Sequence, residues 1–340
     1  MILPPVIVTN FKRRITGVTS TAINVTRRQQ DLAPYKIGLC GPKHGLKLWQ
    51  ALMYGFRPPK EFPFRIWHVR RNSEMAWGLF AKHILRQPIR LIFTSAAIRR
   101  HSPYPRWLIS KMDALVATSD QAAALLDRVD LVQGHGVDTR AFQPGTNQTD
   151  AKTSPIRITC IGRIRPEKGV HILVEALCQV LPSHPGVQMH FIGKVAPAHQ
   201  AFFQEQQRKL TAAGIAAQIT WHDEIPATEV AAHLATSHIL AATPLYEGYG
   251  LTAFEGLASG CAVLLSDTGA FREATAQGET GELVPLSDVP KTAAALGRLL
   301  ADPRALTIKQ RRAREIAVTH FDLDQEASAL LTLYDRIFRP

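Results

Sequence analysis

Two carboxylates around a glycine-rich turn are well placed to bind a polar ligand. Glu247 and Glu255 have seven residues between them, and Gly248 and Gly250 lie in the turn that they frame. The apolar run before the turn predicts a buried strand, and the segment 253–260 predicts a helix. Glycine lets the backbone bend sharply or approach a ligand closely. A strand, a glycine turn and a helix N-terminus favour binding of an anion or a sugar, although an ordinary strand–helix connection has the same pattern.

A basic loop with the sequence G-R-I-R-P-E-K-G, residues 162–169, is the second candidate. Arg163 and Lys168 can project from it toward a diphosphate, and the dipole of the following helix adds to the attraction. Alone, the loop also fits a solvated basic turn. Neither polar loop contains an Asp-x-Asp motif or a cluster of His and Cys. We therefore expect no metal and no cofactor, with fixed cations replacing a metal at a leaving diphosphate.

Strands that alternate with helices must position these loops, and this alternation predicts an α/β fold with parallel sheets. Strands are predicted at 5–9, 35–39, 65–69, 89–94 and 114–118, and then at 156–161, 187–192, 218–221, 239–242 and 262–266. Helices are predicted at 17–30, 73–86, 119–128, 170–180, 227–235 and, in the last of two closing segments, 321–338. Ligands of such sheets bind at the carboxyl ends of the strands, where both loops begin.

A polar segment rich in Gly, Thr, Asn, Asp and Pro, residues 143–155, predicts a linker. The chain has 340 residues, enough for two domains with substantial cores. We therefore predict two Rossmann-like domains facing each other across a cleft. The first covers residues 1–145 and the second covers 156–321, while the C-terminal helix, 322–340, packs back on the first.

The positive charge is concentrated in the first half of the chain. The formal net charge is +12, of which residues 1–150 carry +13 and the remainder −1. A basic half indicates an anionic partner, which could be nucleic acid, a membrane surface or a phosphorylated substrate; simple solubility is the alternative. No apolar run is long enough to span a bilayer. The start does not resemble a signal peptide, and four widely spaced cysteines fit reduced thiols, so we expect a cytoplasmic protein.

These motifs resemble those of a known family, the retaining glycosyltransferases of family 4. The second-domain stretches that carry the resemblance are G-R-I-R-P-E-K-G, P-L-Y-E-G-Y-G-L-T-A-F-E-G-L-A-S-G, V-L-L-S-D-T-G-A-F-R-E and G-E-T-G-E-L-V-P. The stretch H-G-V-D-T-R-A-F-Q-P resembles the end of that family's first domain. The first half looks most like lipopolysaccharide core mannosyltransferases, through T-N-F-K-R-R-I-T-G-V-T-S-T, I-W-H-V-R-R-N-S-E-M and R-W-L-I-S-K-M-D-A-L-V-A-T-S.

The resemblance implies a GT-B fold and a nucleotide-diphosphate sugar donor on the second domain. By that resemblance, Arg163 and Lys168 hold the diphosphate and Glu255 accepts hydrogen bonds from the ribose. Glu247 contacts the transferred sugar, and these two cations with Glu247 form the catalytic set. The backbone groups that help to hold the sugar belong to Gly248, Tyr249, Gly250 and Leu251.

In the first domain, Gly17 matches the family's glycine loop, where a side chain would obstruct the diphosphate or the acceptor. Many members carry a histidine after the strand that matches 89–93, but this chain has Thr-Ser-Ala-Ala there. The identity of any general base is therefore open. The residues predicted to bind the acceptor are Lys12, Arg13, Arg14, His68, Arg70, Arg71 and His101.

The sequence thus predicts a retaining transferase that moves a hexose, mannose from GDP-mannose, to an anionic, Kdo-containing lipopolysaccharide core or another glycolipid. Its place would be the cytoplasm, peripheral on the inner face of the plasma membrane. Rival enzymes are a hexosyltransferase that uses a UDP-sugar and a nucleotide-sugar epimerase, which would leave the basic half unexplained. A nucleic-acid-binding module is disfavoured because no recognised binding motif or interleaved aromatic and basic stripe is present.

Overall fold

The computed structural model describes residues 3–12, 17–97, 99–145 and 155–339. The chain forms two compact units, Met1–Gly136 with Leu323–Pro340, and Val137–Asp322. Residues 137–145, which the sequence assigned to the first domain, belong to the second unit. The Val137 N–H donates to the carbonyl of Phe321 and the Gly145 N–H to that of Ala235, each at 2.8 Å. These backbone bonds tie the segment to the second unit.

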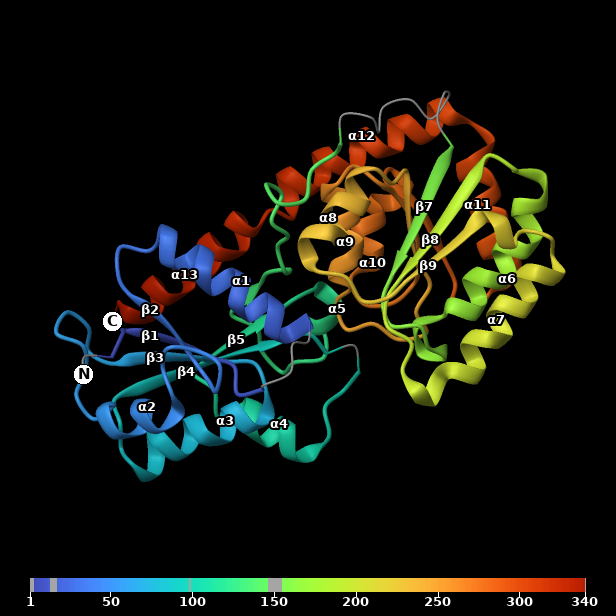
Figure 1. Cartoon of the computed structure of the whole chain (residues 1–340). Coiled ribbons are helices and arrows are strands. Elements are labelled where there is room, and N and C mark those ends of the chain that lie inside the picture. The colour runs from blue at the N-terminus through green and yellow to red at the C-terminus, as the bar shows by residue number, and fades with distance from the viewer. Residues whose placement is uncertain (1–2, 13–16, 98, 146–154, 340) are drawn as a thin grey trace. The chain divides into compact units, whose positions relative to one another are not determined.

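The first unit contains a six-stranded parallel sheet in the order β2-β1-β3-β4-β5-β6 (Figure 1). Its strands are β1 (Val6–Thr9), β2 (Ile37–Cys40), β3 (Arg65–Val69), β4 (Ile89–Ser95), β5 (Ala114–Ala117) and β6 (Leu131–Val132). The strand order reverses between β1 and β3. In open α/β sheets, ligands bind outside the carboxyl ends of the strands at such a switch point.

Helices cover both faces of this sheet (Figure 1). They are α1 (Gly17–Leu32), α2 (Leu48–Tyr54), α3 (Asn72–Leu79), α4 (Pro103–Ser110), α5 (Asp120–Ala123) and α13 (Leu323–Phe338), with a π-helical turn at Phe80–Ile84. Ile7 and Trp67 point into the core under α2, α3 and α4. Val8 and Ile66 point into the opposite core, to which α13 contributes Leu330 and Tyr334. The C-terminal helix therefore packs on the first unit, as predicted.

The second unit contains a six-stranded parallel sheet in the order β12-β11-β10-β7-β8-β9. Its strands are β7 (Ile156–Ile161), β8 (Val187–Ile192), β9 (Ile219–His222), β10 (Ile239–Ala242), β11 (Ala262–Ser266) and β12 (Gly281–Val284). Here the order reverses between β7 and β10, which is the order of a dinucleotide-binding sheet. The switch point thus lies between the two strands that lead into the polar loops.

The helices of the second unit also cover both faces of their sheet (Figure 1). The α-helices are α6 (Val170–Val180), α7 (Gln200–Ala212), α8 (Ala227–Ala235), α9 (Leu251–Ala258), α10 (Phe271–Thr275), α11 (Val289–Ala301) and α12 (Pro303–His320). Short 3₁₀ turns lie at Pro166–Lys168, Leu181–Ser183, Pro197–His199, Ala216–Gln218 and Ala276–Gly278. One core lies against α6 and α11, and the other lies against α9, α10 and α12. Among the described residues, every helix is too short or too polar to cross a membrane.

Several predicted element boundaries are wrong. The helix predicted at 73–86 is α-helical only to Leu79 and continues as a π-helical turn. The helix predicted at 119–128 is the single turn α5, which Ser119 caps by accepting a hydrogen bond from the Ala122 N–H at 3.1 Å. Strands β6 and β12 were not predicted, because β6 has two residues and β12 contains a glycine and a glutamate, which are depleted in strands.

Candidate functional site

Backbone contacts hold together the two loops at the switch point of the second unit. Gly169, which ends the loop after β7, has a positive φ of 64°, and a Cβ there would lie 1.7 Å from the carbonyl oxygen of Thr243. The Thr243 hydroxyl donates to the Gly169 carbonyl at 3.0 Å, and the Leu245 N–H donates to the Glu167 carbonyl at 3.1 Å. Only glycine suits this position, since it allows both the left-handed backbone and the close approach.

An ion pair joins the two loops across the switch point. Lys168 Nζ lies 2.6 Å from Glu247 Oε2, and the two side chains keep 28% and 23% of their surface exposed. A pair that water reaches in this way contributes little to stability, about 0–1 kcal/mol. A polyanionic ligand can therefore replace Glu247 as the partner of the Lys168 ammonium group at a small cost in free energy. The sequence placed both residues in the site, but it did not predict that they contact each other.

Arg163 projects from the same loop and is exposed. It forms no hydrogen bond or ion pair with any described residue of the chain. Its guanidinium group has five N–H donors and suits bidentate recognition of phosphate. Among the described residues, the loop therefore presents Arg163 without a partner and Lys168 held only by a weak ion pair.

The glycine turn after β10 positions Glu247 and the start of α9. Gly250 caps α9 with a φ of 93°, and a Cβ there would lie 2.0 Å from the ring of Phe271. The Glu247 N–H donates to the Thr268 hydroxyl at 3.3 Å, so the loop after β11 supports the turn. The first backbone N–H groups of a helix have no partner within it and attract anions. The helix begins at Leu251, two residues before the predicted start.

Glu255 lies on α9 and is partly exposed at its surface. Burial raises the pKa of its carboxyl group to about 7. The structure gives this carboxyl group no hydrogen-bond or ion-pair partner among the described residues. A desolvated acceptor without a partner costs folding free energy, and hydroxyl donors of a ligand would recover part of that cost.

Between the loops after β7 and β10 lies a recess of about 10 Å³. Gly162, Lys168, Glu247, Thr252 and Phe271 are among its lining residues. The recess is far smaller than a nucleotide sugar, for which ligand pockets of about 300–1,000 Å³ are usual. A ligand of that size would therefore lie over these loops rather than inside the recess.

The switch point of the first unit is occupied by a side chain of the protein itself. Glu74 of α3 is fully buried and accepts hydrogen bonds from both strand ends. Its carboxylate accepts from the Thr9 hydroxyl at 2.9 Å, the Phe11 N–H at 3.2 Å, the Arg70 N–H at 2.8 Å and Arg71 Nη1 at 3.0 Å. Sequence analysis missed Glu74, because its partners lie as many as 65 positions away.

Several residues predicted to bind the acceptor lie inside the first unit. His68 is fully buried, with its ring nitrogens 2.6 Å from the Tyr334 hydroxyl and 2.6 Å from that of Thr94, and burial lowers its pKa well below the ordinary value. The Arg70 side chain is 2% exposed, and it donates to the Thr21 hydroxyl at 3.0 Å and faces Glu326. These environments do not support direct contact with an acceptor for either residue.

The other predicted first-unit residues have different surroundings. The guanidinium group of Arg71 donates to Asn10 Oδ1 at 2.8 Å. His101 Nε2 lies 3.4 Å from the Ser95 hydroxyl, and burial lowers the pKa of the ring. At Gly17 a Cβ would meet none of the described atoms within 4 Å. The predicted residues Arg13 and Arg14 lie outside the described part of the chain.

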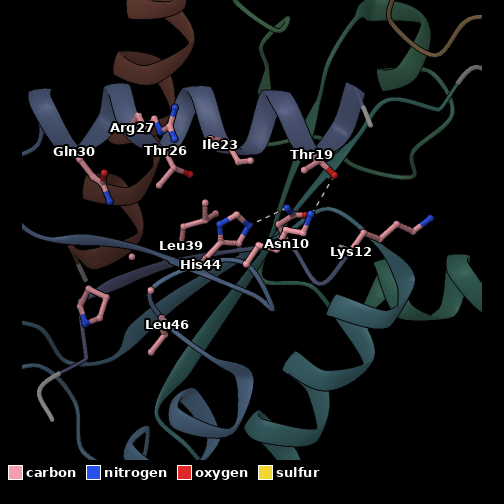
Figure 2. A pocket seen from close by; sticks show the side chains of 14 residues that line it. Asn10, Lys12, Thr19, Ile23, Thr26, Arg27, Gln30, Leu39, His44 and Leu46 are labelled. Atoms are coloured by element: carbon pink, nitrogen blue, oxygen red, sulfur yellow. Dashed lines mark hydrogen bonds between the residues drawn. The ribbon is translucent and has the colours of Figure 1, made fainter. Parts of the chain in front are cut away.

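A pocket of about 580 Å³ lies in the first unit beneath α1 (Figure 2). One wall is a face of α1 that carries Ile23 and Arg27, and the other is formed by β2 and the loop that follows it. Asn10 Nδ2 lies 3.1 Å from His44 Nε2 across the floor. The described lining residues are Pro4, Asn10, Lys12, Thr19, Ile23, Thr26, Arg27, Gln30, Gly38, Leu39, Lys43, His44, Gly45 and Leu46.

The lining of this pocket is cationic. Lys12, Arg27 and Lys43 are exposed at its rim, and none of the described lining residues is acidic. Burial, Lys47 and Arg27 lower the pKa of His44, so its ring is neutral at neutral pH. The sequence predicted only Lys12 of these residues. Arg27 could have been recognised as a cation within the helix predicted at 17–30. Lys43 and His44 lie in a loop whose course the sequence does not determine.

Comparisons with known proteins agree with this architecture. The family model described as "Glycosyl transferases group 1" matches residues 145–318. The lipopolysaccharide core biosynthesis mannosyltransferase LpcC of Rhizobium leguminosarum bv. viciae is 38% identical, over 98% of this chain and 96% of the relative. The corresponding LpsB of Rhizobium meliloti (strain 1021) is 34% identical, over 98% of both chains. The structure of sucrose-phosphate synthase from Thermosynechococcus elongatus has a TM-score of 0.78 at 16% identity, over 98% of both chains.

Two six-stranded parallel sheets, each covered by helices on both faces, give the chain the GT-B type of α/β fold. The chain belongs to the glycosyl transferases group 1, and it is a glycosyltransferase. The predicted fold class and enzyme class are therefore confirmed.

Proposed function

We propose that this glycosyltransferase moves mannose from GDP-mannose to a lipopolysaccharide core acceptor, with retention of the anomeric configuration. The observation that carries the donor site is the arrangement at the switch point of the second unit. There Lys168 and Glu247 form an exchangeable pair beside Arg163, which has no partner in the part of the chain that the structure describes. The sugar and the acceptor class are supported by the two relatives that match almost the whole chain, both named as lipopolysaccharide core mannosyltransferases.

In the proposed donor complex, the diphosphate lies over the loop after β7. Arg163 and Lys168 neutralise its charge, and the N-terminus of α9 adds backbone donors and a favourable dipole. Once the diphosphate holds Lys168, Glu247 is released to accept hydrogen bonds from the sugar hydroxyls. Glu255 accepts hydrogen bonds from the ribose, because its carboxyl group has no protein partner among the described residues.

The proposed reaction proceeds on one face of the sugar. The bond between the anomeric carbon and the phosphate oxygen breaks, and the acceptor hydroxyl oxygen forms its bond to the same face of that carbon. The proton of the acceptor hydroxyl passes to the departing phosphate oxygen. Arg163 and Lys168 stabilise the charge that develops on the diphosphate, so the step needs no protein base and no metal.

We place the anionic part of the acceptor in the pocket beneath α1. A lipopolysaccharide core presents carboxylates and phosphates, and Lys12, Arg27 and Lys43 surround a pocket of about 580 Å³. Ile23, Leu39 and Leu46 supply apolar surface for the rest of the ligand. This arrangement gives the excess charge of the first half a specific use.

We further propose that the enzyme works in the cytoplasm, on the inner face of the plasma membrane, and docks through the layer formed by α2, α3 and α4. This layer covers one face of the first sheet (Figure 1). Its exposed apolar residues are Trp49, Met53, Tyr54, Phe56, Trp77, Phe80, Ile84, Tyr104 and Trp107. Trp and Tyr favour the membrane interface, and the exposed cations Arg86, Arg106 and Lys111 would each gain about 1 kcal/mol at an anionic surface.

The transfer assay supplies GDP-mannose or UDP-glucose together with a Kdo-containing core acceptor, and NMR identifies the anomer of the product. We expect α-mannosyl transfer from GDP-mannose, and an unchanged rate after addition of EDTA. Conversion of the donor without an acceptor would indicate an epimerase, and transfer from UDP-glucose alone would refute the donor. An inverted product, or loss of transfer in EDTA by an enzyme that circular dichroism shows to remain folded, would refute the proposed step.

Membrane docking is tested by cosedimentation with phosphatidylglycerol vesicles. The double variant Trp49→Ser, Trp107→Ser should bind at least several-fold more weakly than the wild type. Ile308→Ser is the control, because Ile308 is an apolar residue of the second unit that is somewhat more exposed than either tryptophan. Equal binding by all three proteins would refute docking through this layer.

A further inference from the structure

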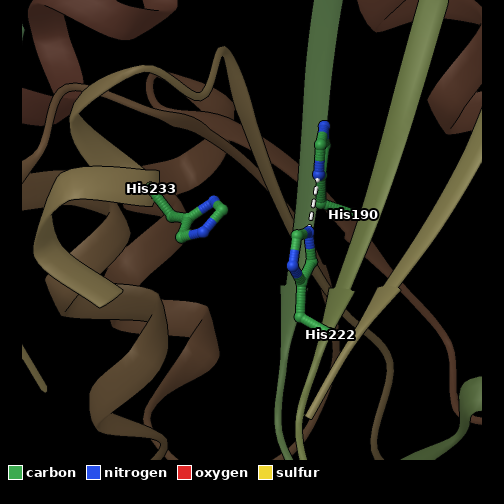
Figure 3. A group of neighbouring side chains, drawn as sticks. All are labelled: His190, His222 and His233. Carbon is green, nitrogen blue, oxygen red and sulfur yellow. Dashed lines mark hydrogen bonds between the residues drawn. The ribbon is translucent and has the colours of Figure 1, made fainter. Parts of the chain in front are cut away.

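Three histidines outside the proposed donor site lie together in the second unit (Figure 3). His190 lies in β8, His222 ends β9, and His233 lies in the last turn of α8. One possible ligand nitrogen from each ring lies within 4.8 Å of the others. Nδ1 of His190 and Nε2 of His222 are only 3.0 Å apart. Three imidazoles therefore converge on one small volume.

The register of the sheet brings the first two rings together. His190 pairs with Thr220, and Ile192 pairs with His222, so the two histidines are diagonal neighbours on one face of the sheet. Their rings are nearly parallel, with an interplanar angle of 17°. His233 completes the group from the helix, with its ring centroid 4.9 Å from that of His222. All three side chains are partly exposed, so an ion can reach them.

We propose that His190, His222 and His233 form a binding site for a divalent transition-metal ion such as Zn²⁺, which three imidazoles can hold in tetrahedral geometry. Zinc binds histidine nitrogen at about 2.0–2.1 Å, so two nitrogens on one tetrahedral ion lie on the order of 3.4 Å apart. His190 Nδ1 and His222 Nε2 share a hydrogen bond at 3.0 Å, close to that value, and metal binding would move its proton to the other nitrogen of the donor ring. A rotation of the His233 side chain would complete three ligands and leave a fourth position for water.

Burial, reinforced by nearby positive charge, keeps the rings of His190 and His233 neutral. Burial, then the nearby Arg157, lowers the pKa of His190 to about 4, and burial, His222 and Arg157 lower that of His233. Both rings are therefore neutral ligands at neutral pH. Arg157 opposes a dication, while Glu229, one turn before His233 on α8, supplies negative charge that raises the pKa of His233. His190 Nε2 is buried with no hydrogen-bond partner in the described structure.

A bound ion would fasten α8 and the edge strand β9 to β8. The free energy of binding would add to the free energy of unfolding, so the melting temperature should rise with metal concentration. This readout is independent of sugar transfer, and failure of the metal site would leave the proposed function untouched.

The experiment titrates the chelator-treated full chain with Zn²⁺ by calorimetry and with Co²⁺ by visible absorption. We expect one ion per chain, a Co²⁺ spectrum of nitrogen ligation, and a higher melting temperature in Zn²⁺. His233→Gln and His222→Asn should each weaken binding at least tenfold and remove the thermal shift. Circular dichroism checks that both variants fold, and His320→Gln, which changes an exposed histidine of α12, is the control.

Two results would overturn the metal site. One is the absence of stoichiometric binding to the wild type at submillimolar metal. The other is equal affinity in His233→Gln, His222→Asn and His320→Gln, which would place any bound ion elsewhere.

Discussion

The switch points of the two sheets use their charges in opposite ways. In the first unit, Glu74 has no exposed surface and accepts four hydrogen bonds from the ends of β1 and β3. In the second, the Lys168–Glu247 pair is partly exposed and Arg163 is unpaired with respect to the described residues. The same topological position thus serves the stability of one unit and remains available to a ligand in the other. A binding site is therefore identified by whether the polar side chains at the switch point are already paired within the protein, and not by topology alone.

The largest expected effect is on the stability of the first unit. Glu74→Ala removes one partner each from the Arg71 guanidinium group and the Thr9 hydroxyl and leaves two backbone N–H groups without their acceptor, so it should lower the free energy of unfolding by about 3–5 kcal/mol. Glu247→Ala, at the other switch point, should change it by about 1 kcal/mol or less. Urea denaturation measures both. Similar losses in the two variants would remove the proposed difference between the switch points.

The second effect concerns Glu255, whose pKa burial raises to about 7. A carboxyl group with a raised pKa destabilises the folded state when it is ionised. This destabilisation is complete above pH 7 and shrinks as the pH falls toward 4.5, the ordinary pKa of a glutamate side chain. Glu255→Gln should therefore raise the free energy of unfolding at pH 8 by about 2–3 kcal/mol. Denaturation at pH 8 and pH 5 tests this, and a gain that did not shrink at pH 5 would contradict it.

The third effect separates the two partners of the exchangeable pair. Lys168→Ala should weaken GDP-mannose binding about tenfold or more, because it removes a charge-assisted contact worth about 1.5–3 kcal/mol. Glu247→Gln should lower kcat more than it changes donor affinity, since its proposed contact is with the sugar that develops charge. Steady-state kinetics with a donor-binding titration measures both. A Glu247→Gln enzyme with normal kcat would contradict the proposed sugar contact.

The smallest effect is expected at the pocket beneath α1. Arg27→Ala and Lys43→Ala should each raise the acceptor KM by up to about fivefold and leave donor affinity unchanged, because both cations are exposed and screened by salt. Lys36→Ala removes an exposed cation of the same unit that does not line the pocket, and it should leave KM unchanged. Equal effects of all three substitutions would indicate a general field rather than a site.

The sequence predicted those parts of the structure that depend on local patterns. The central strands, such as β7 and β11, are continuous apolar runs between polar loops, and their bounds were predicted correctly. The glycine turns before α6 and α9 were recognisable from their glycines, and Gly169 and Gly250 adopt positive φ in the structure. The sequence also identified the two loops that meet at the candidate site. The roles of their residues stay predictions.

Other features depend on contacts between distant residues and were not predictable in this way. The burial of Glu74 results from the pairing of β1 with β3, and the pocket beneath α1 results from the path of the loop after β2. Arg70 and His68 looked like exposed cleft residues because they follow or end a strand. Their burial depends on α13, whose Tyr334 and Glu326 lie more than 250 positions away.

The measurement that tests the central claim most directly is calorimetric titration of GDP-mannose into the wild type, Arg163→Ala and Arg208→Ala. Arg208 is an exposed arginine of α7 in the same unit, paired with Glu205, and its removal changes the net charge equally. The account predicts that Arg163→Ala binds the donor about tenfold or more weakly, while Arg208→Ala binds like the wild type. Wild-type affinity in Arg163→Ala, or the same loss in both variants, would contradict a donor site at this switch point.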